Sequence, residues 1–133
     1  MSRVIRISFE IKDIYNREDF RILYNRYMGE TDNVELFIIS EDTTAYINSV
    51  QAQLGIAEAN VISCDDIDEK IEAIDDNNID IHFDNLQSNI VDIEEDNTDV
   101  TCILVNQMTD YYGYDLSYVK EFERAIKEII ENT

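Results

Sequence analysis

Short apolar segments alternate with segments of helical periodicity along this chain, and that alternation limits its fold more than any other feature. Five segments have the length and apolar character of strands: residues 4–9, 34–40, 59–63, 79–83 and 101–105. Five segments have the apolar spacing of helices: residues 17–28, 43–54, 65–77, 86–96 and 116–132. Strands that alternate with helices form parallel sheets, because each parallel connection needs a crossover of helix length. The pattern predicts an α/β three-layer sandwich with a mostly parallel five-stranded sheet.

The composition indicates one domain. The chain has 133 residues, no proline and three glycines, and no low-complexity linker divides it, so we expect a single domain over residues 1–133. Its apolar runs are too short to span a bilayer, and its N-terminus lacks the apolar segment of a secretion signal. Cys64 and Cys102 lie in apolar contexts without a CxxC spacing, which favours free thiols. Together these features predict a cytoplasmic protein.

Charge is distributed unevenly along the chain. Thirty Asp and Glu residues against ten Lys and Arg residues give a formal net charge of −20. Residues 27–119 hold 22 of the acids and one base, Lys70, whereas six of the ten bases lie in the first 26 residues. Direct binding of nucleic acid requires clustered Lys and Arg, so we expect none. The acidic block is either a solvated surface or a face that competes with DNA or RNA for a basic partner.

Polar residues follow the expected strands at the point where each strand ends. They are Glu10, Ser40, Ser63, Asp84 and Asn106. In an open parallel sheet, ligands bind at the carboxyl ends of the strands. The stretch "IDIHFDN" is the most informative, because it delivers Asp84 from an apolar strand to that edge. A carboxylate in this place suits a metal ligand or a catalytic acid or base.

The order of these residues resembles the haloacid-dehalogenase-like (HAD-like) superfamily of phosphohydrolases, in a small form without a cap domain. In that family the first strand carries an Asp-x-Asp motif, the second ends in Ser or Thr, and a Lys precedes a strand with acidic metal ligands. The resemblance spans about residues 4–106 and assigns these roles to Ser40, Lys70 and Asp84. It implies a Rossmannoid fold and an aspartate that attacks phosphorus with the help of Mg²⁺ and Lys.

The first strand departs from the family pattern. The Asp-x-Asp motif would fall on "FEIKD", which puts Glu10 at the nucleophile and Lys12 at the acid/base position. Glu10 is longer by one methylene, which misplaces an attack that needs near-contact geometry, and Lys12 brings a positive charge in place of a proton shuttle. Asn85 stands where a second acid is often found. We expect a degenerate scaffold without a cofactor, in which Glu10 and Lys12 pair with Asp84 or with each other.

Two other uses of this pocket remain open. If phosphohydrolase activity survives, Glu10 and Asp84 hold Mg²⁺ and the substrate is a small phosphate ester or a nucleotide. If the pocket binds an anion without turnover, Lys12, Lys70 and Ser40 hold that anion. The enzyme needs the two carboxylates, whereas the anion binder needs the two lysines.

Other metal or nucleophile constellations have little support in the sequence. His82, the only histidine, lies within an expected strand, where we expect one satisfied hydrogen bond rather than catalysis. Cysteine and histidine are too few for a zinc site, and no pattern supports a Cys–His nucleophile. The acidic run at residues 92–99 lacks the central Gly and the terminal Glu of an EF-hand loop, so we expect a solvated helix end there.

Two segments are candidates for binding a partner protein, one acidic and one rich in tyrosine. Their candidate residues are Asp92, Glu94, Glu95 and Asp96 in the first segment, and Tyr111, Tyr112, Tyr114 and Asp115 in the second. Rigid tyrosine rings bury much area at low entropic cost, so these rings either anchor a partner or pack under the last helix.

Taken together, the sequence predicts a non-catalytic acidic protein that engages a basic protein and inhibits or modulates it. A nucleic-acid-binding enzyme is the kind of partner that an acidic mimic of DNA or RNA would meet. Small acidic proteins of this kind occur among bacteriophage products that disable host defences or transcription, and by that analogy we expect a phage-encoded factor. Binding driven by charge should weaken as salt rises.

Overall fold

The computed structural model of the chain describes residues 4–11, 34–42, 44–97, 99–105 and 117–131. They contain five strands: β1 (Ile5–Phe9), β2 (Val34–Ser40), β3 (Val61–Ser63), β4 (Ile81–Asp84) and β5 (Thr101–Leu104). The described α-helices are α2 (Thr44–Leu54), α3 (Ile67–Asp76), α4 (Gln87–Asp96) and α5 (Ser117–Glu131). A 3₁₀ turn, η1 (Glu58–Asn60), precedes β3.

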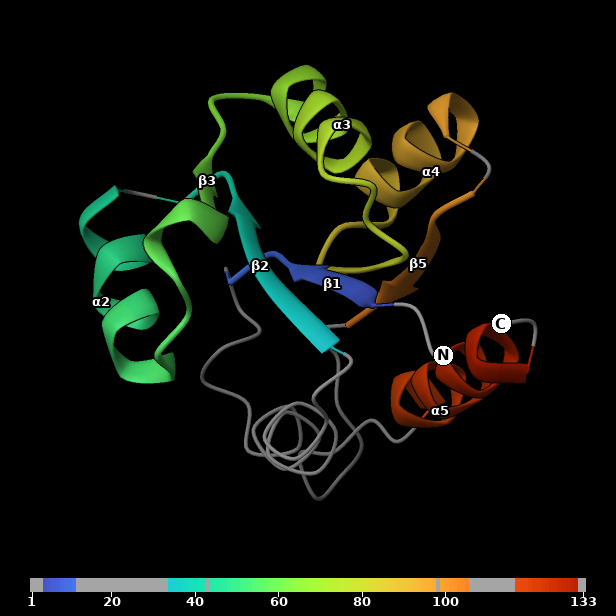
Figure 1. Cartoon of the computed structure of the whole chain (residues 1–133). Coiled ribbons are helices and arrows are strands. Elements are labelled where there is room, and N and C mark those ends of the chain that lie inside the picture. Colours follow the sequence, from blue (N-terminus) through green and yellow to red (C-terminus); the bar gives the residue numbers. More distant parts are fainter. Residues whose placement is uncertain (1–3, 12–33, 43, 98, 106–116, 132–133) are drawn as a thin grey trace, which may run out of the picture.

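The five strands form one parallel sheet in the order β3-β2-β1-β4-β5 (Figure 1). Central strand β1 pairs through residues 5–9 with β2 and through residues 7–9 with β4. The chain builds outward from β1 through β2 to β3, and then returns to the other side of β1 for β4 and β5. The predicted α/β fold class is confirmed, with every described strand parallel. A topological switch point lies between β1 and β4, where such folds place ligand sites.

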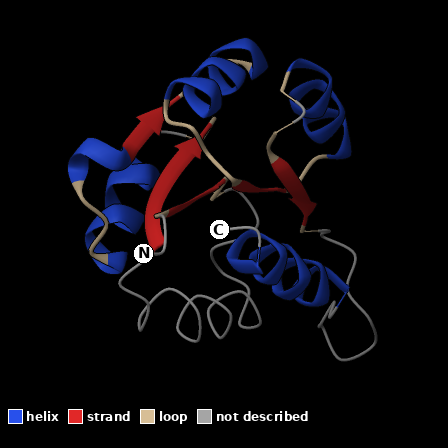
Figure 2. Ribbon diagram, turned by 45° about the vertical axis from the view of Figure 1, so that its right-hand side comes forward, coloured by secondary structure: helices blue, strands red, loops and turns tan. Residues whose placement is uncertain are grey.

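Helices cover both faces of the sheet and make a three-layer, Rossmann-like arrangement. Helices α3 and α4 lie on one face, and α2 and α5 lie on the other (Figures 1 and 2). Phe37 and Ile39 of β2 pack with Ile74 of α3, whereas Ile38 belongs to the core that includes Phe122 of α5. Alternate residues of a strand point to opposite faces, so β2 needs apolar side chains at consecutive positions. This explains the continuous run "LFII" in its sequence.

Local sequence signals set the limits of the helices. Helix α2 ends at Gly55, which has a φ of +69° and whose N–H donates to the carbonyl of Gln51 at 3.0 Å. A left-handed backbone of this kind favours glycine. Helix α3 begins after Asp66, whose side chain accepts a hydrogen bond from the backbone N–H of Glu69 at 2.9 Å. Asp66 is therefore an N-cap of the usual type.

Some expected elements differ from the structure. The strand expected over residues 59–63 begins only at Val61, because residues 58–60 form η1. Asn60 Nδ2 donates to the carbonyl of Leu36 at 3.1 Å and holds that turn against β2. The helix expected over residues 17–28 lies outside the described residues. Among the described helices, none combines the length and apolar character that crossing a membrane requires.

Candidate functional site

Four polar side chains meet at the carboxyl edge of the sheet. Glu10 follows β1, and Ser40 and Asp84 are the last residues of β2 and β4. Lys70 reaches them from α3. Glu10 is 2% exposed, and the other three are fully buried. The structure therefore brings together four residues that the sequence predicts as a site, at the switch point of the sheet.

The ammonium group of Lys70 is the centre of this cluster. Its Nζ lies 3.1 Å from Glu10 Oε1, 3.0 Å from Glu41 Oε2 and 3.0 Å from Asp84 Oδ2. An ammonium group has three N–H donors, and these three carboxylates account for all of them. Lys70 therefore has no donor left over for a phosphate or another anion.

Asp84 is saturated with hydrogen bonds in the same way. Its Oδ1 accepts the backbone N–H of Leu86 at 3.0 Å and Asn89 Nδ2 at 3.3 Å. Its Oδ2 accepts Lys70 Nζ at 3.0 Å and His82 Nε2 at 2.9 Å. A carboxylate offers about four acceptor positions. Because protein donors use all of them, a metal ion could bind Asp84 only by displacing one of these donors.

Glu10 ties the cluster to β2. Its Oε1 accepts the backbone N–H of Glu41 at 2.8 Å and Lys70 Nζ at 3.1 Å. Its Oε2 accepts the hydroxyl of Ser40, which in turn accepts the backbone N–H of Asp42 at 3.1 Å. These bonds join the ends of β1 and β2 to the segment that enters α2.

A chain of hydrogen bonds continues from Asp84 into the sheet. His82 Nε2 lies 2.9 Å from Asp84 Oδ2, and His82 Nδ1 lies 2.7 Å from Ser8 Oγ. An ionised carboxylate only accepts, so Nε2 carries the shared hydrogen. Contacts between Ser, His and Asp serve catalysis where the hydroxyl reaches a substrate. Here all three side chains are fully buried, with Ser8 in the middle of β1. The chain of bonds therefore orients Asp84 and offers no accessible nucleophile.

Opposite charges determine the ionisation of the cluster. Burial alone would raise the pKa of Asp84, but the hydrogen bond and charge of His82 and the charge of Lys70 outweigh burial and hold this pKa well below its ordinary value. Burial alone would lower the pKa of Lys70, but the charges of Asp84 and Glu10 raise it well above its ordinary value. At neutral pH the Lys70 ammonium and the Asp84 carboxylate are therefore both charged.

The remaining residues predicted from the sequence have several outcomes: some lie beside the cluster or away from it, and others make contacts that the sequence did not predict. Ser63 ends the edge strand β3 and is exposed. Asn85 is 8% exposed beside Asp84. His82 makes two hydrogen bonds rather than the one expected. Glu10 pairs with Lys70, and its expected pairing with Lys12 involves a residue outside the described ones. Those that lie outside the described residues are Lys12, Asn106, Tyr111, Tyr112, Tyr114 and Asp115.

Three members of the cluster were not expected from the sequence: Ser8, Glu41 and Asn89. Ser8 alternates with the core residues of β1, as Glu10 does, and this spacing is a signal that both face α3 and α4. Glu41 precedes helix α2, where an acid also complements the helix dipole, so its position alone does not indicate a contact with Lys70. Asn89 Nδ2 lies 3.2 Å from Glu41 Oε2. The contacts of Glu41 and Asn89 depend on how α3 and α4 pack, for which the sequence carries no local signal.

The cluster does not fit a magnesium site. Mg²⁺ requires near-octahedral oxygen ligands at about 2.0–2.1 Å. The carboxylates of Glu10, Glu41 and Asp84 instead converge on the ammonium of Lys70. In the part of the chain that the structure describes, no group of three or more His, Cys, Asp or Glu side chains is placed to hold a metal ion.

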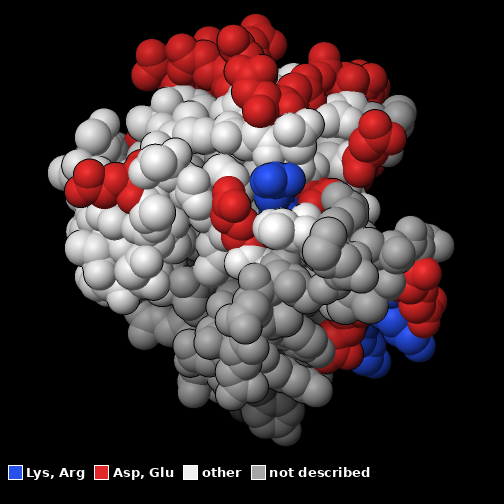
Figure 3. All heavy atoms as spheres, in the orientation of Figure 1, with Lys and Arg blue, Asp and Glu red and all other residues white. Residues whose placement is uncertain are grey.

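A second candidate region is the outer surface of α3 and α4 with their flanking turns, where acidic side chains gather (Figure 3). This acidic face consists of twelve exposed acids: Asp65, Asp66, Asp68, Glu69, Glu72, Asp75, Asp76, Asp92, Glu94, Glu95, Asp96 and Asp99. It includes the four α4 acids expected to bind a partner. It contains no exposed base, because Lys70 is buried. By contrast, α2 has no charged residue and α5 carries both signs of charge.

Comparison of the chain with family models, with curated proteins and with solved structures finds no match. Function must therefore be inferred from the chemistry of the buried cluster and of the acidic face.

Proposed function

We propose that this protein is a non-catalytic acidic binding protein on a degenerate HAD-like scaffold, which engages a basic protein through its acidic face. The observation that carries this proposal is the one-sided charge, twelve exposed acids over α3 and α4 without an exposed base. Such a surface attracts basic partners and disfavours acidic ones. A nucleic-acid-binding protein fits best, because it presents clustered Lys and Arg to phosphates. Occupation of that surface inhibits or modulates the partner in the cytoplasm.

The closed cluster at the sheet edge supports a binding role over catalysis. Phosphoryl transfer needs a nucleophile in near contact with phosphorus and a cation beside the transferred group. The carboxylates of Glu10 and Asp84 are instead paired with Lys70 and shielded from solvent. The central position of β1 and the meeting of Ser40, Lys70 and Asp84 support a HAD-like scaffold that keeps these residues for structure.

The acidic face is unfavourable for the protein on its own. Helix C-termini favour basic residues, yet the last turns of α3 and α4 contain none. Acids four residues apart, such as Asp68 and Glu72, repel each other along α3. Asp75 of α3 makes a hydrogen bond that raises the pKa of Asp96 of α4. A cationic partner would offset this excess of negative charge, whereas a surface that serves only solubility needs no such concentration of charge.

The test compares two variants with the same loss of charge. Asp68→Asn, Glu72→Gln and Glu95→Gln remove three charges from the acidic face. Glu121→Gln, Glu128→Gln and Glu131→Gln remove three exposed charges from α5. Binding to a panel of basic nucleic-acid-binding proteins is measured by biolayer interferometry over a range of salt concentrations. We expect wild-type binding that weakens steeply with salt, is lost in the first variant and is retained in the second.

Competition with DNA adds a second readout. If the acidic face occupies the phosphate-binding surface of the partner, a DNA duplex should displace the protein from it. Binding that is insensitive to salt, or equally reduced in both variants, would contradict the proposal.

A further inference from the structure

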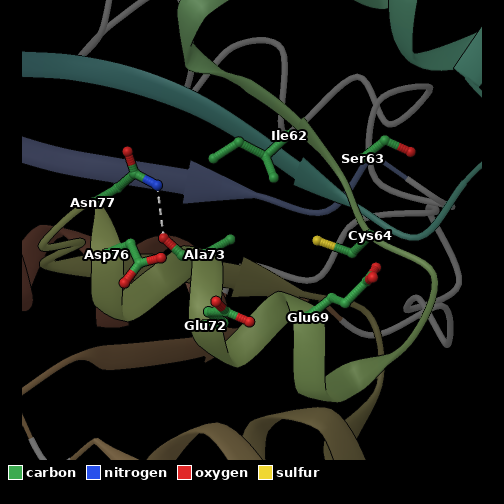
Figure 4. A pocket seen from close by; sticks show the side chains of 8 residues that line it. All are labelled: Ile62, Ser63, Cys64, Glu69, Glu72, Ala73, Asp76 and Asn77. Atoms are coloured by element: carbon green, nitrogen blue, oxygen red, sulfur yellow. Dashed lines mark hydrogen bonds between the residues drawn. The ribbon is translucent and has the colours of Figure 1, made fainter.

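A cleft opens on the acidic face between edge strand β3 and helix α3 (Figure 4). Its volume is about 310 Å³. Ligand pockets run from about 300 to 1,000 Å³, so this cleft suits one side chain rather than a cofactor. The lining residues that matter here are Ile62 and Cys64 at β3, and Glu69, Glu72, Ala73 and Asp76 of α3.

Carboxylates form one wall of the cleft. Glu69, Glu72 and Asp76 are spaced three and four residues apart, so they lie on one stripe of α3. Glu69 Oε2 accepts the backbone N–H of Asp65 at 2.5 Å. Among the described residues, the side chains of Glu72 and Asp76 have no hydrogen-bond or ion-pair partner. Two unpaired carboxylates thus line a cleft near the negative end of a helix dipole.

The remaining lining is apolar and includes a buried thiol. Cys64 is 3% exposed, and Figure 4 shows its sulfur directed into the cleft, between Ile62 and Ala73 on one side and Glu69 on the other. In the described part of the chain, the Cys64 sulfur has no hydrogen-bond partner. Burial raises the pKa of Cys64 to about 11, so at neutral pH the group is a thiol and not a thiolate metal ligand. Cys64 belongs to the apolar core that includes Phe37 and Ala73, and a buried thiol behaves as a small apolar group, so Cys64 extends the apolar lining of the cleft.

We propose that this cleft binds an arginine side chain of the basic partner. This site rests on the proposed function, because it is a contact through which the acidic face would hold the basic partner. The methylene stem of the arginine packs on Ile62 and Ala73, and its guanidinium pairs with Glu72 and Asp76, which lie one helical turn apart. Burial of the stem and pairing of the head together use both kinds of surface in the cleft.

Arginine fits this cleft better than other cations do. Its planar guanidinium donates paired hydrogen bonds to carboxylates and is weakly hydrated, so it tolerates an apolar wall. A lysine ammonium is a compact, strongly hydrated charge that gains less from such a wall. A metal ion would leave the apolar lining unused, and the described residues hold no metal-binding group.

The test titrates the full chain with two fluorescein-labelled peptides that carry equal numbers of arginine or lysine residues separated by Gly-Ser pairs. Glu72→Gln with Asp76→Asn removes the unpaired carboxylates of the cleft. Asp92→Asn with Glu95→Gln removes two exposed acids of α4 and is the matched control. We expect the arginine peptide to bind more tightly than the lysine peptide. The cleft variant should weaken its binding about tenfold and the control less than about threefold.

Backbone amide shifts give a second, independent readout. In ¹⁵N-labelled protein the arginine peptide should move the signals of residues 62–64 and 72–77 and leave those of α4 in place. Because all four substituted side chains are exposed, the variants should keep the fold, and thermal unfolding checks this.

The outcomes separate this inference from the proposed function. Equal weakening in both variants, or equal affinity for the two peptides, would overturn the arginine site and leave the acidic face as the binding surface. Absence of peptide binding would overturn the site as well. The proposed function fails only if the basic proteins themselves do not bind through the acidic face.

Discussion

Lys70 Nζ lies 3.0 Å from Asp84 Oδ2, and neither side chain is accessible to solvent. Removal of two charges from water costs several kcal/mol for each, so a buried pair is stable only with further partners. Lys70 has Glu10 and Glu41 as additional acceptors, and Asp84 has donors on both of its oxygens. Each charge therefore depends on the others, and loss of any one leaves its neighbours buried without compensation.

Replacement of Lys70 by Met should therefore be strongly destabilising. The methionine fills similar space but leaves Glu10 and Asp84 buried without a cation, so we expect a loss of about 3–5 kcal/mol in the free energy of unfolding. Urea denaturation at pH 7 measures this. Lys120→Met, at an exposed position of α5, is the control and should change stability by less than about 0.5 kcal/mol. A Lys70→Met protein as stable as the control would show that the cluster is not needed for folding.

Stability should depend on pH through Asp84. Its pKa is depressed in the folded state, so the ionised form stabilises the fold above the ordinary carboxyl pKa of about 3.9, and this contribution is lost as the pH falls further. The difference in unfolding free energy between wild type and Asp84→Asn should be constant from about pH 5 to 8 and shrink below about pH 4. Urea denaturation of both proteins across this range measures the difference. The surface acids are the same in both proteins, so their titration cancels from it. A difference that grows on acidification would contradict it.

Asp96→Asn should make the protein more stable at neutral pH. The hydrogen bond with Asp75 raises the pKa of Asp96, which means that the ionised form is disfavoured in the folded state. The substitution also removes a negative charge from the C-terminal end of α4. We expect a higher melting temperature at pH 7 and a smaller gain at acidic pH, where Asp96 of the wild type is protonated. Asp92→Asn, on the same helix, should give a smaller gain at pH 7.

The two cysteines should react slowly with thiol reagents in the native protein. Burial raises the pKa of both thiols, from the ordinary value of 9.0 to about 11 for Cys64 and to about 12 for Cys102. At a fixed pH below the pKa, each unit by which the pKa rises lowers the thiolate fraction about tenfold, so Cys64 should react about 100-fold more slowly than in unfolded protein. Ellman's reagent at pH 8, with and without guanidinium, measures both rates. The Cys102→Ser variant isolates Cys64, and a native rate within tenfold of the unfolded rate would contradict the burial.

Magnesium should not confer phosphatase activity on this protein. The oxygens of Asp84 are occupied by protein donors, and Lys70 takes the place that a metal ion would need. We expect no turnover of phosphate esters or nucleotides in excess Mg²⁺, for wild type and for Asp84→Asn alike. Turnover that disappears in a folded Asp84→Asn protein would instead show a working metal site and favour the phosphohydrolase alternative.

The strands could be predicted because a strand buried in a sheet needs apolar residues at successive or alternate positions. Strand β2 is buried on both faces, so its apolar run defines it, and the predicted bounds agree with the structure. Strand β3 was predicted too long, because residues 58–60 are held in a turn by a side-chain contact with Leu36. That contact joins residues far apart in the sequence, and local propensity does not report it.

The site was predicted in part, for a similar reason. Glu10, Ser40 and Asp84 stand at strand ends, which sequence pattern locates well. Lys70 lies three residues after Ile67 and four before Ile74, so it stands on the apolar stripe of α3, a mark of its burial. Which carboxylates its ammonium meets depends on tertiary packing, and no spacing in the sequence determines that.

The central position of β1 has a consequence for folding during synthesis. β1 is the first of the described strands to be made, yet it pairs with β4, whose His82 follows Ser8 by 74 residues. Until Asp84 leaves the ribosome, one edge of the central strand has no partner, and Lys70 lacks the third of its carboxylate partners. Contacts so distant form slowly, and chains released early would expose an unpaired core strand. Products truncated before β4 should therefore aggregate or require a chaperone, even though they contain all of α3.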